Sequence, residues 1–170
     1  DSWKDIKKIF YDFFGKAKPN AAHLALAELE KMGLLKAVIT QNIDNLHQDA
    51  GSKVVYEFHG TASTLLCLRC NERFAAQNFS FEEMPPKCPK CGGRIKPDFV
   101  FYGEGIPEKA YRMSMQEATE SDAVIVIGTT GEVMPACIVP QIARQNGAKI
   151  IEINISRSAL TYGTTTHFLQ

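Results

Sequence analysis

Four cysteines are arranged in two matched pairs, and this spacing can build a metal site. Each pair has the form Cys-x-x-Cys and 17 residues separate the pairs, at Cys67, Cys70, Cys88 and Cys91. Two residues between cysteines let one tight turn direct both sulfurs at a single ion, and two such turns complete a tetrahedral zinc site. Four thiolates leave no open position on the metal, so we expect a structural zinc ion. The alternative is two disulfide bonds, which the knuckle-like spacing and the lack of a signal-peptide pattern disfavour.

Further candidates for chemistry lie at the ends of four short apolar runs that are typical of buried strands, within residues 36–40, 54–58, 123–128 and 149–155, and the candidates begin after residues 39, 58, 127 and 153. In a parallel sheet, ligands bind beyond the carboxyl ends of the strands, so the residues after these runs should form a ligand rim. The residues at these ends are small or polar: Thr40, Gln41, Asn42 and Asp44, then His59 and Gly60, then Gly128, Thr129 and Thr130, and finally Asn154 and Ser156.

Helical patterns alternate with these strands, and together they predict the fold class. The helices are expected within residues 3–14, 21–31, 43–50, 107–120 and 140–146. Strands that are apolar along their length and alternate with helices predict an α/β fold, with a parallel sheet covered by helices on both faces. Residues 61–97 hold the four cysteines and are rich in Pro and Gly. They predict a loop-rich, zinc-ribbon-like module inserted into a larger domain of residues 1–60 and 98–170.

Composition and charge favour an ordinary globular protein. The chain carries 19 basic and 19 acidic residues and has no net charge at neutral pH. We therefore expect neither nucleic-acid binding nor attraction to anionic membranes. No apolar run approaches the roughly 18 residues that a membrane helix needs, and a cytoplasmic, reducing location is expected. The fifth cysteine, Cys137, is expected to be a buried small apolar residue.

Read in order, these residues resemble the sirtuin (Sir2) family of NAD-dependent protein deacylases. The matching segments cover nearly the whole chain: Lys18–Asn20, Thr40–His47, Glu57–Gly60, the cysteine pairs, Lys96–Glu104, Ile127–Thr130 and Ile153–Asn154. The resemblance implies a Rossmann-like NAD-binding domain with an inserted zinc module. It also implies a protein-lysine deacetylase that consumes NAD as co-substrate and releases nicotinamide and O-acyl-ADP-ribose. Acyl-lysine proteins or peptides would be its substrates.

The resemblance also implies roles for individual residues. His59 matches the family's catalytic histidine, which deprotonates a ribose hydroxyl of NAD, and an imidazole can take up a proton at neutral pH. Taken alone, a histidine at a strand end is more often structural. The NAD-binding positions are Gln41, Asn42 and Asp44 at the nicotinamide and ribose, Gly128, Thr129 and Thr130 at the phosphates and ribose, Asn154 at the adenosine ribose, and Ser156 as a further cofactor-binding residue. Thr130 replaces the commoner serine and keeps its hydroxyl.

Three of these implied roles have simpler alternatives. An ordinary strand-to-helix turn would explain Gly128, Thr129 and Thr130. A helix N-cap by Asn42 or Thr40 would also explain the polar residues after residue 39. The acyl-lysine tunnel is assigned to Val100, Phe101, Tyr102 and Gly103, with Val133 in the strand-like segment 131–134 on the other side of the peptide. Plain core packing would explain this aromatic run equally well. His23, His47 and His167 are expected to be structural or surface residues.

The chain departs from the family pattern in three ways. It lacks the glycine-rich turn that holds the pyrophosphate and the family's last segment near the adenine, so we expect this chain alone to bind NAD weakly and turn over slowly. Tyr11 is followed three residues later by Phe14, where a tyrosine–arginine pair would select acidic acyl groups, so neutral acyl groups such as acetyl are expected.

Two other classes of function remain alternatives. One is an ADP-ribosyltransferase or NAD hydrolase, and the other is a non-catalytic zinc-containing binding module.

Overall fold

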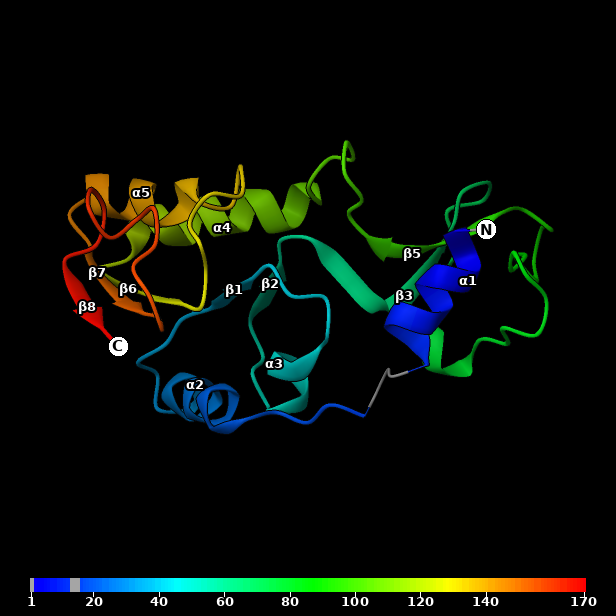
Figure 1. The fold of residues 1–170 in the computed structure, drawn as a ribbon, viewed down its shortest axis with the longest axis horizontal. Coiled ribbons are helices and arrows are strands. Elements are labelled where there is room, and N and C mark those ends of the chain that lie inside the picture. Colours follow the sequence, from blue (N-terminus) through cyan, green and yellow to red (C-terminus); the bar gives the residue numbers. More distant parts are fainter. Residues whose placement is uncertain (1, 13–15) are drawn as a thin grey trace. The chain divides into compact units, whose positions relative to one another are not determined.

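The computed structural model describes residues 2–12 and 16–170 of the chain (Figure 1). Phe14, on which the expectation about neutral acyl groups depends, lies outside the described residues. The chain divides into two compact units, Asp1–Pro107 and Glu108–Gln170, and each is described by itself. This division does not test the module boundaries expected above, which stay a prediction. Within the described residues, no helix has the length and apolar character needed to cross a membrane.

The first unit contains two small sheets and several short helices. Its elements are α1 (Ser2–Ile6), the π-helix η1 (Lys7–Tyr11), α2 (Ala21–Lys31), β1 (Val38–Thr40), α3 (Leu46–Asp49), β2 (Val55–Glu57), β3 (Gly60–Cys67), β4 (Arg73–Ala75), the 3₁₀ helix η2 (Ala76–Asn78) and β5 (Ile95–Phe99). β1 and β2 pair in parallel, whereas β4, β3 and β5 form an antiparallel sheet with β3 in the centre. The predicted strands near 36–40 and 54–58 are thereby confirmed.

α2 begins and ends where the sequence predicts. The Asn20 side chain accepts hydrogen bonds from the backbone N–H groups of Ala22 and His23, at 3.0 and 3.2 Å. The backbone N–H of Asn20 in turn donates to Nδ1 of the His23 ring, and the two sets of hydrogen bonds together form a capping box. Gly33 follows the helix with φ +77°, a conformation that favours glycine.

The cysteine-containing segment is more regular than the predicted loop-rich module. β3 runs for eight residues and pairs with both β4 and β5. Leu65, Cys67 and Ile95 are buried in this sheet. Aromatic residues pack against this core both from within the segment, at Phe74, Phe79 and Phe81, and from the distant N-terminal helices, at Trp3 and Tyr11. The many Pro and Gly residues obscure the strand pattern in the sequence, but burial against these rings makes it stable.

The second unit is a parallel sheet with two helices. Its elements are α4 (Glu108–Glu120), β6 (Ala123–Ile127), α5 (Ile138–Gln145), β7 (Lys149–Ile153) and β8 (His167–Leu169). The three strands are parallel in the order β6-β7-β8. α4 and α5 lie together along this sheet (Figure 1). The predicted mixed α/β fold with parallel sheets is confirmed.

β6 differs from expectation in its burial. Its sequence is apolar along the whole length, which predicts a strand buried on both faces. In the structure alternate residues are exposed, with 37% of Ile125 and 43% of Ile127 accessible. β8 was not predicted, because three residues, His167–Leu169, are too few to show a period.

Candidate functional site

The ends of β1 and β2 bring the first group of predicted residues to one edge. The two strands are parallel and Thr40 lies opposite Glu57, so the residues that follow each strand meet at that edge. Gln41, Asn42 and Asp44 follow β1, and His59 follows β2. Phe58, which is fully buried, donates from its backbone N–H to the Thr40 carbonyl at 2.8 Å. This bond continues the pairing as far as the residue before His59.

The backbone of His59 is held on both sides. Val100 donates its N–H to the His59 carbonyl oxygen at 2.9 Å. The next residue, Gly60, has φ +72°, and a Cβ there would stand 2.3 Å from the Asp98 carbonyl oxygen. Only glycine fits so close to β5, which explains the His59-Gly60 pair in the sequence. The His59 side chain itself is half-buried, so one side remains accessible to a ligand.

The loop after β1 is ordered by its own polar side chains. The Thr40 hydroxyl accepts from Asn42 N–H at 3.1 Å, and an Asp44 carboxylate oxygen accepts from Leu46 N–H at 3.1 Å at the start of α3. Thr40 thus closes the turn with its side chain, as the simpler alternative expected, but neither Thr40 nor Asn42 caps a helix: the N-cap residue of α3 is Asn45, and it makes no side-chain cap hydrogen bond. Ala62 N–H donates to the Ile43 carbonyl at 2.9 Å and ties the loop to β3. Asn42 is exposed and Gln41 is half-buried.

His23 and His47 pack against each other beside this loop. Their ring centroids are 4.7 Å apart, and within the described residues the buried Nδ1 of His47 has no hydrogen-bond partner. Burial, followed by the nearby His23 ring, lowers the pKa of His47. These contacts support the structural role expected for both histidines.

The segment after β5 holds the predicted acyl-lysine residues in different environments. Phe101 is half-buried, and its ring packs on buried Phe99 with centroids 4.9 Å apart. Tyr102 is fully exposed, so its side chain does not pack beside the other predicted tunnel residues of the first unit. Gly103 has φ +87°, which turns the chain back toward Glu104. The ring of Phe10 lies 5.0 Å from that of Phe99, a contact that the helical pattern of the N-terminal segment did not reveal.

In the second unit, β6 and β7 bring together the other group of predicted residues. Ile127 lies opposite Ile153 in the parallel pair, so Gly128 and Asn154 follow at the same edge. Gly128 has φ +62° and donates its N–H to the Ile153 carbonyl at 3.1 Å. Asn154 donates from its side-chain amide to the Thr129 carbonyl at 2.8 Å.

The turn after β6 is packed tightly on one side and open on the other. The Thr129 hydroxyl accepts from Gly131 N–H at 3.2 Å, and a Cβ at Gly131 would stand 2.6 Å from the Leu160 side chain. Thr130, Val133 and Ser156 are exposed. The turn after β6 therefore presents the exposed hydroxyl of Thr130, and Ser156 presents a second one after β7; a hydroxyl group can donate to a phosphate oxygen.

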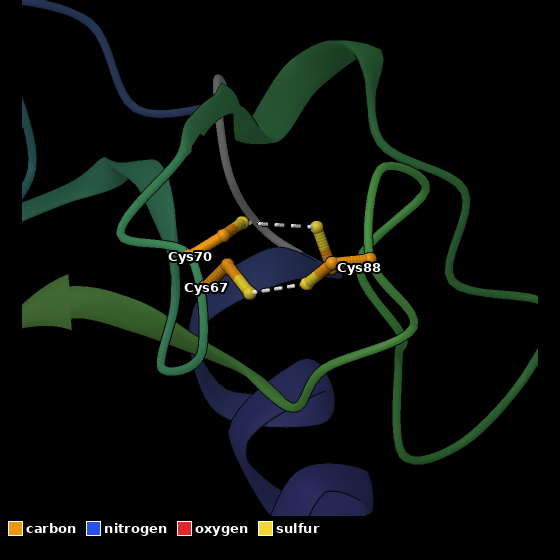
Figure 2. A group of neighbouring side chains, drawn as sticks. Cys67, Cys70 and Cys88 are labelled. Carbon is orange, nitrogen blue, oxygen red and sulfur yellow. Dashed lines mark hydrogen bonds between the residues drawn. The ribbon is translucent and has the colours of Figure 1, made fainter.

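The four cysteines of the paired motifs form one cluster (Figure 2). All four sulfurs lie within 4.8 Å of one another. The Cys67 and Cys91 sulfurs are 3.5 Å apart, and those of Cys70 and Cys88 are 3.8 Å apart. A disulfide bond would need about 2.05 Å, so the disulfide alternative is excluded in this structure. Zn–S bonds of about 2.3 Å place the sulfurs of a tetrahedral site about 3.8 Å apart, which fits the observed separations.

The surroundings of Cys67 favour its thiolate. The backbone N–H of Cys70, together with that of Arg69, lowers the pKa of the Cys67 thiol to about 6 although burial opposes this shift. A Cβ at Gly93 would approach the Cys67 and Cys91 sulfurs to 3.1 and 3.2 Å. The missing side chain at Gly93 thus leaves room for the sulfurs to converge. The donor set and geometry fit one structural zinc ion. Cys137, in the second unit, is buried, as predicted.

Comparisons with known proteins agree with these observations. The family model described as "Sir2 family" matches residues 1–135. An NAD-dependent protein deacylase of Thermococcus kodakarensis is 48% identical over 152 residues, which cover 86% of this chain and 59% of that protein. The chain thus spans about three fifths of the length of this curated relative.

Solved structures show the same fold. A structure described as "Sir2-p53 peptide-NAD+" matches with a TM-score of 0.91 and 35% identity, over 98% of this chain and 70% of that chain. A structure described as "Sir2 bound to acetylated peptide" matches with a TM-score of 0.92 and 34% identity, over 98% of this chain and 71% of that one. From the strand-end residues, the cysteine cluster and these matches together, we conclude that the chain belongs to the Sir2 family.

Proposed function

We propose that this chain carries the catalytic and zinc-binding part of an NAD-dependent protein-lysine deacetylase. The observation that carries the proposal is the position of His59. Its backbone is held through Val100 and Gly60 at the sheet edge where β1 ends and the loop with Gln41, Asn42 and Asp44 begins. A relative of this chain is named as an NAD-dependent protein deacylase, and similar structures hold NAD and an acetylated peptide. These names support the same function here.

In the proposed reaction His59 is the general base. After the acyl oxygen of the substrate has displaced nicotinamide from NAD, the His59 imidazole takes the proton of a ribose hydroxyl. The activated hydroxyl oxygen then attacks the acyl carbon, the bond between the acyl carbon and the lysine nitrogen breaks, and free lysine leaves. One water molecule then adds to the acyl carbon of the remaining cyclic intermediate and opens it, so that the products, together with the nicotinamide already released, are free lysine and O-acyl-ADP-ribose. His59 suits the role of general base because its side chain is half-buried and its backbone is held by a hydrogen bond. A base must be both accessible and oriented.

The remaining polar residues are proposed to bind NAD. Asp44, Gln41 and Asn42 offer carboxylate and amide groups for the carboxamide and ribose of the nicotinamide end. In the second unit, Gly128, Thr129 and the exposed Thr130 of the turn after β6 are proposed to bind the phosphates and a ribose, Asn154 the adenosine ribose, and exposed Ser156 is a further proposed NAD-binding residue. Val100, Phe101 and Gly103, with Val133, are proposed to bind the acyl-lysine, whereas exposed Tyr102 has the least support.

The zinc ion is proposed to have a structural role. Cys67, Cys70, Cys88 and Cys91 supply four thiolates, so the metal has no position left for a substrate. The cysteines are free thiols in the structure, which supports a reducing, cytoplasmic setting.

A comparison of the full-length protein with its His59→Ala variant tests the deacetylase function. The wild-type protein, given NAD and an acetyl-lysine peptide, is expected to form O-acetyl-ADP-ribose, and the variant is expected to lose at least about 100-fold in turnover. Mass spectrometry of the products separates the alternatives. ADP-ribosylated protein would indicate a transferase, free ADP-ribose a hydrolase, and no NAD-derived product with zinc still bound a binding module.

A further inference from the structure

We propose that Lys96 and Glu104 form an ion pair that positions residues 99–104 for binding of the acyl-lysine peptide. We call residues 99–104 the peptide loop. The inference rests on the deacetylase function proposed above. It assigns a positioning role to two residues that lie in the Lys96–Glu104 motif of the sequence but to which the motif itself gives no role.

The Lys96 ammonium group makes three contacts with the peptide loop. Its Nζ donates to a Glu104 carboxylate oxygen at 2.5 Å and to the Phe99 carbonyl oxygen at 3.1 Å. The same nitrogen stands 5.1 Å from the centre of the Phe101 ring, within the range of a cation–π interaction. An ammonium group has three hydrogens, and within the described residues the contacts of the Lys96 ammonium group go to the peptide loop. Lys96 therefore connects the first, third and last residues of the loop.

Glu104 closes the loop from the other end. The carboxylate oxygen that meets Lys96 also accepts from the Phe101 N–H at 3.0 Å. The Glu104 N–H in turn donates to the Phe101 carbonyl at 2.9 Å, across a turn that needs the positive φ of Gly103. Both backbone groups of Phe101 are thereby occupied by one residue, so the direction of its ring depends on Glu104.

The low exposure of Lys96 distinguishes this pair from the ion pair on α2, although Glu104 itself is exposed. The side chains of Lys96 and Glu104 are 19% and 42% exposed, whereas those of Lys31 and Glu28 on α2 are 77% and 60% exposed. Fully exposed pairs contribute little because water and salt screen them, whereas here the ammonium group is largely shielded and both partners make further hydrogen bonds that fix their geometry. The Lys96 ammonium, with the Phe101 N–H, also lowers the pKa of the Glu104 carboxyl, so Glu104 is charged at neutral pH.

The peptide loop is joined directly to the proposed general base. Val100, inside the loop, donates its N–H to the His59 carbonyl, and Phe99 lies opposite Gly60 in the β3–β5 pairing. An extended peptide that pairs with the loop would use the remaining backbone groups of this segment. Loss of the ion pair would therefore disorder the peptide-binding segment first, while the NAD-binding residues after β1 keep their own hydrogen bonds.

Steady-state kinetics on the full-length protein test this proposal, with an acetyl-lysine peptide and NAD each varied. We expect Lys96→Met to raise the KM for the peptide roughly ten-fold, the effect of losing one charged hydrogen bond, while kcat and the KM for NAD change less than about three-fold. Glu104→Gln keeps an acceptor for Phe101 and should lie between wild type and Lys96→Met. Lys96→Arg keeps the charge and the donors and should restore a KM near that of wild type.

Lys31→Met is the matched control, because it breaks an ion pair of the same unit outside the loop. Hydrogen exchange adds a readout independent of turnover: the Val100 and Phe101 amides should exchange faster in Lys96→Met than in the control. An unchanged peptide KM in Lys96→Met and Glu104→Gln, with an active wild type, would overturn the role of the pair alone. A wild-type protein that neither binds nor deacetylates the peptide would overturn the deacetylase function and this role with it.

Discussion

At the scale of single residues, Gly60 shows how strictly the proposed catalytic position is constrained. Its positive φ and its contact with the Asp98 carbonyl both exclude a side chain, and it directly follows His59. Any residue larger than glycine must move either β5 or the turn that carries the imidazole. The sequence pair His59-Gly60 is therefore a structural unit as well as a family motif.

We expect Gly60→Ala to lower both stability and activity. The left-handed backbone alone costs about 1–2 kcal/mol for a residue with a Cβ, and the approach to Asp98 adds to this. Gly33→Ala is the control, because Gly33 has a similar φ of +77° but nothing within 4 Å of the added Cβ. Urea unfolding and deacetylation assays measure the two effects. Equal losses of stability in the two variants would show that the contact with Asp98 does not constrain the turn.

At the scale of secondary-structure elements, Glu152 on β7 holds the segment that supports the turn after β6. Glu152 is fully buried, and one of its carboxylate oxygens accepts from the hydroxyl groups of Thr161 and Thr165, at 2.9 and 2.6 Å. In the same segment Ala159 donates its N–H to the Thr130 carbonyl at 2.9 Å. Glu152 thus connects the centre of the sheet to the proposed phosphate-binding turn.

The charge of Glu152 makes a pH-dependent contribution to stability. Burial alone raises its pKa, but hydrogen bonds from Ser158, Thr165 and Thr161 outweigh burial, and the net pKa is lowered. Because the folded state holds this proton less tightly than the unfolded state, the contribution is present above the unfolded pKa, near ~4.3. It is lost as the pH falls through the pKa of the folded state.

We expect Glu152→Gln to lower the free energy of unfolding at neutral pH by roughly 1.5–3 kcal/mol, the usual range for hydrogen bonds to a charged group. The difference between variant and wild type should shrink as the pH falls below the unfolded pKa. Glu120→Gln on α4 is the exposed control and should change stability by less than about 0.5 kcal/mol. Urea unfolding over a pH series measures both. A difference that stays constant with pH would contradict the proposed charged state.

At the scale of the whole molecule, the cysteine cluster and the N-terminal helices share one core. Trp3 donates from its indole Nε1 to the Ile95 carbonyl at 3.1 Å, and Tyr11 packs on Phe81 with ring centroids 4.9 Å apart. These rings pack against the buried Cys67 and Cys88. Metal binding in such a module contributes directly to its folding, so zinc should also order the N-terminal segment.

We expect one zinc ion per chain, and we expect its removal by a chelator to change the fluorescence of Trp3, the chain's single tryptophan. Cys88→Ser should show the same change without a chelator, whereas Cys137→Ala, at a cysteine outside the cluster, should not. Hydrogen exchange should show loss of protection in β3 and β5 while β6 and β7, in the other compact unit, keep theirs. Unchanged Trp3 fluorescence in metal-free protein would contradict the shared core.

Local patterns in the sequence were enough to predict much of the fold and the zinc cluster. The patterns involved are local, because each depends on neighbours within a few residues. They are the Cys-x-x-Cys pairs, the helical period of α2 and the apolar runs of β1, β2, β6 and β7. Helix and strand periods are short, so a single sequence can reveal them. The same patterns, with the parallel fold they imply, indicated which polar residues follow each strand. The individual roles assigned to those residues stay proposals until the variants are measured.

Other features were decided only by the tertiary structure, because their partners are distant or have no periodic pattern. β3 pairs with β5 although about 30 residues lie between them, and Trp3 reaches Ile95 across most of the first unit. The requirement for glycine at residue 60 comes from the Asp98 backbone, and the role of Lys96 comes from Glu104. By itself, the sequence determined which residues are available for metal binding and catalysis. Tertiary packing decided which of them face one another, because burial and hydrogen bonding between distant segments depend on the whole folded chain.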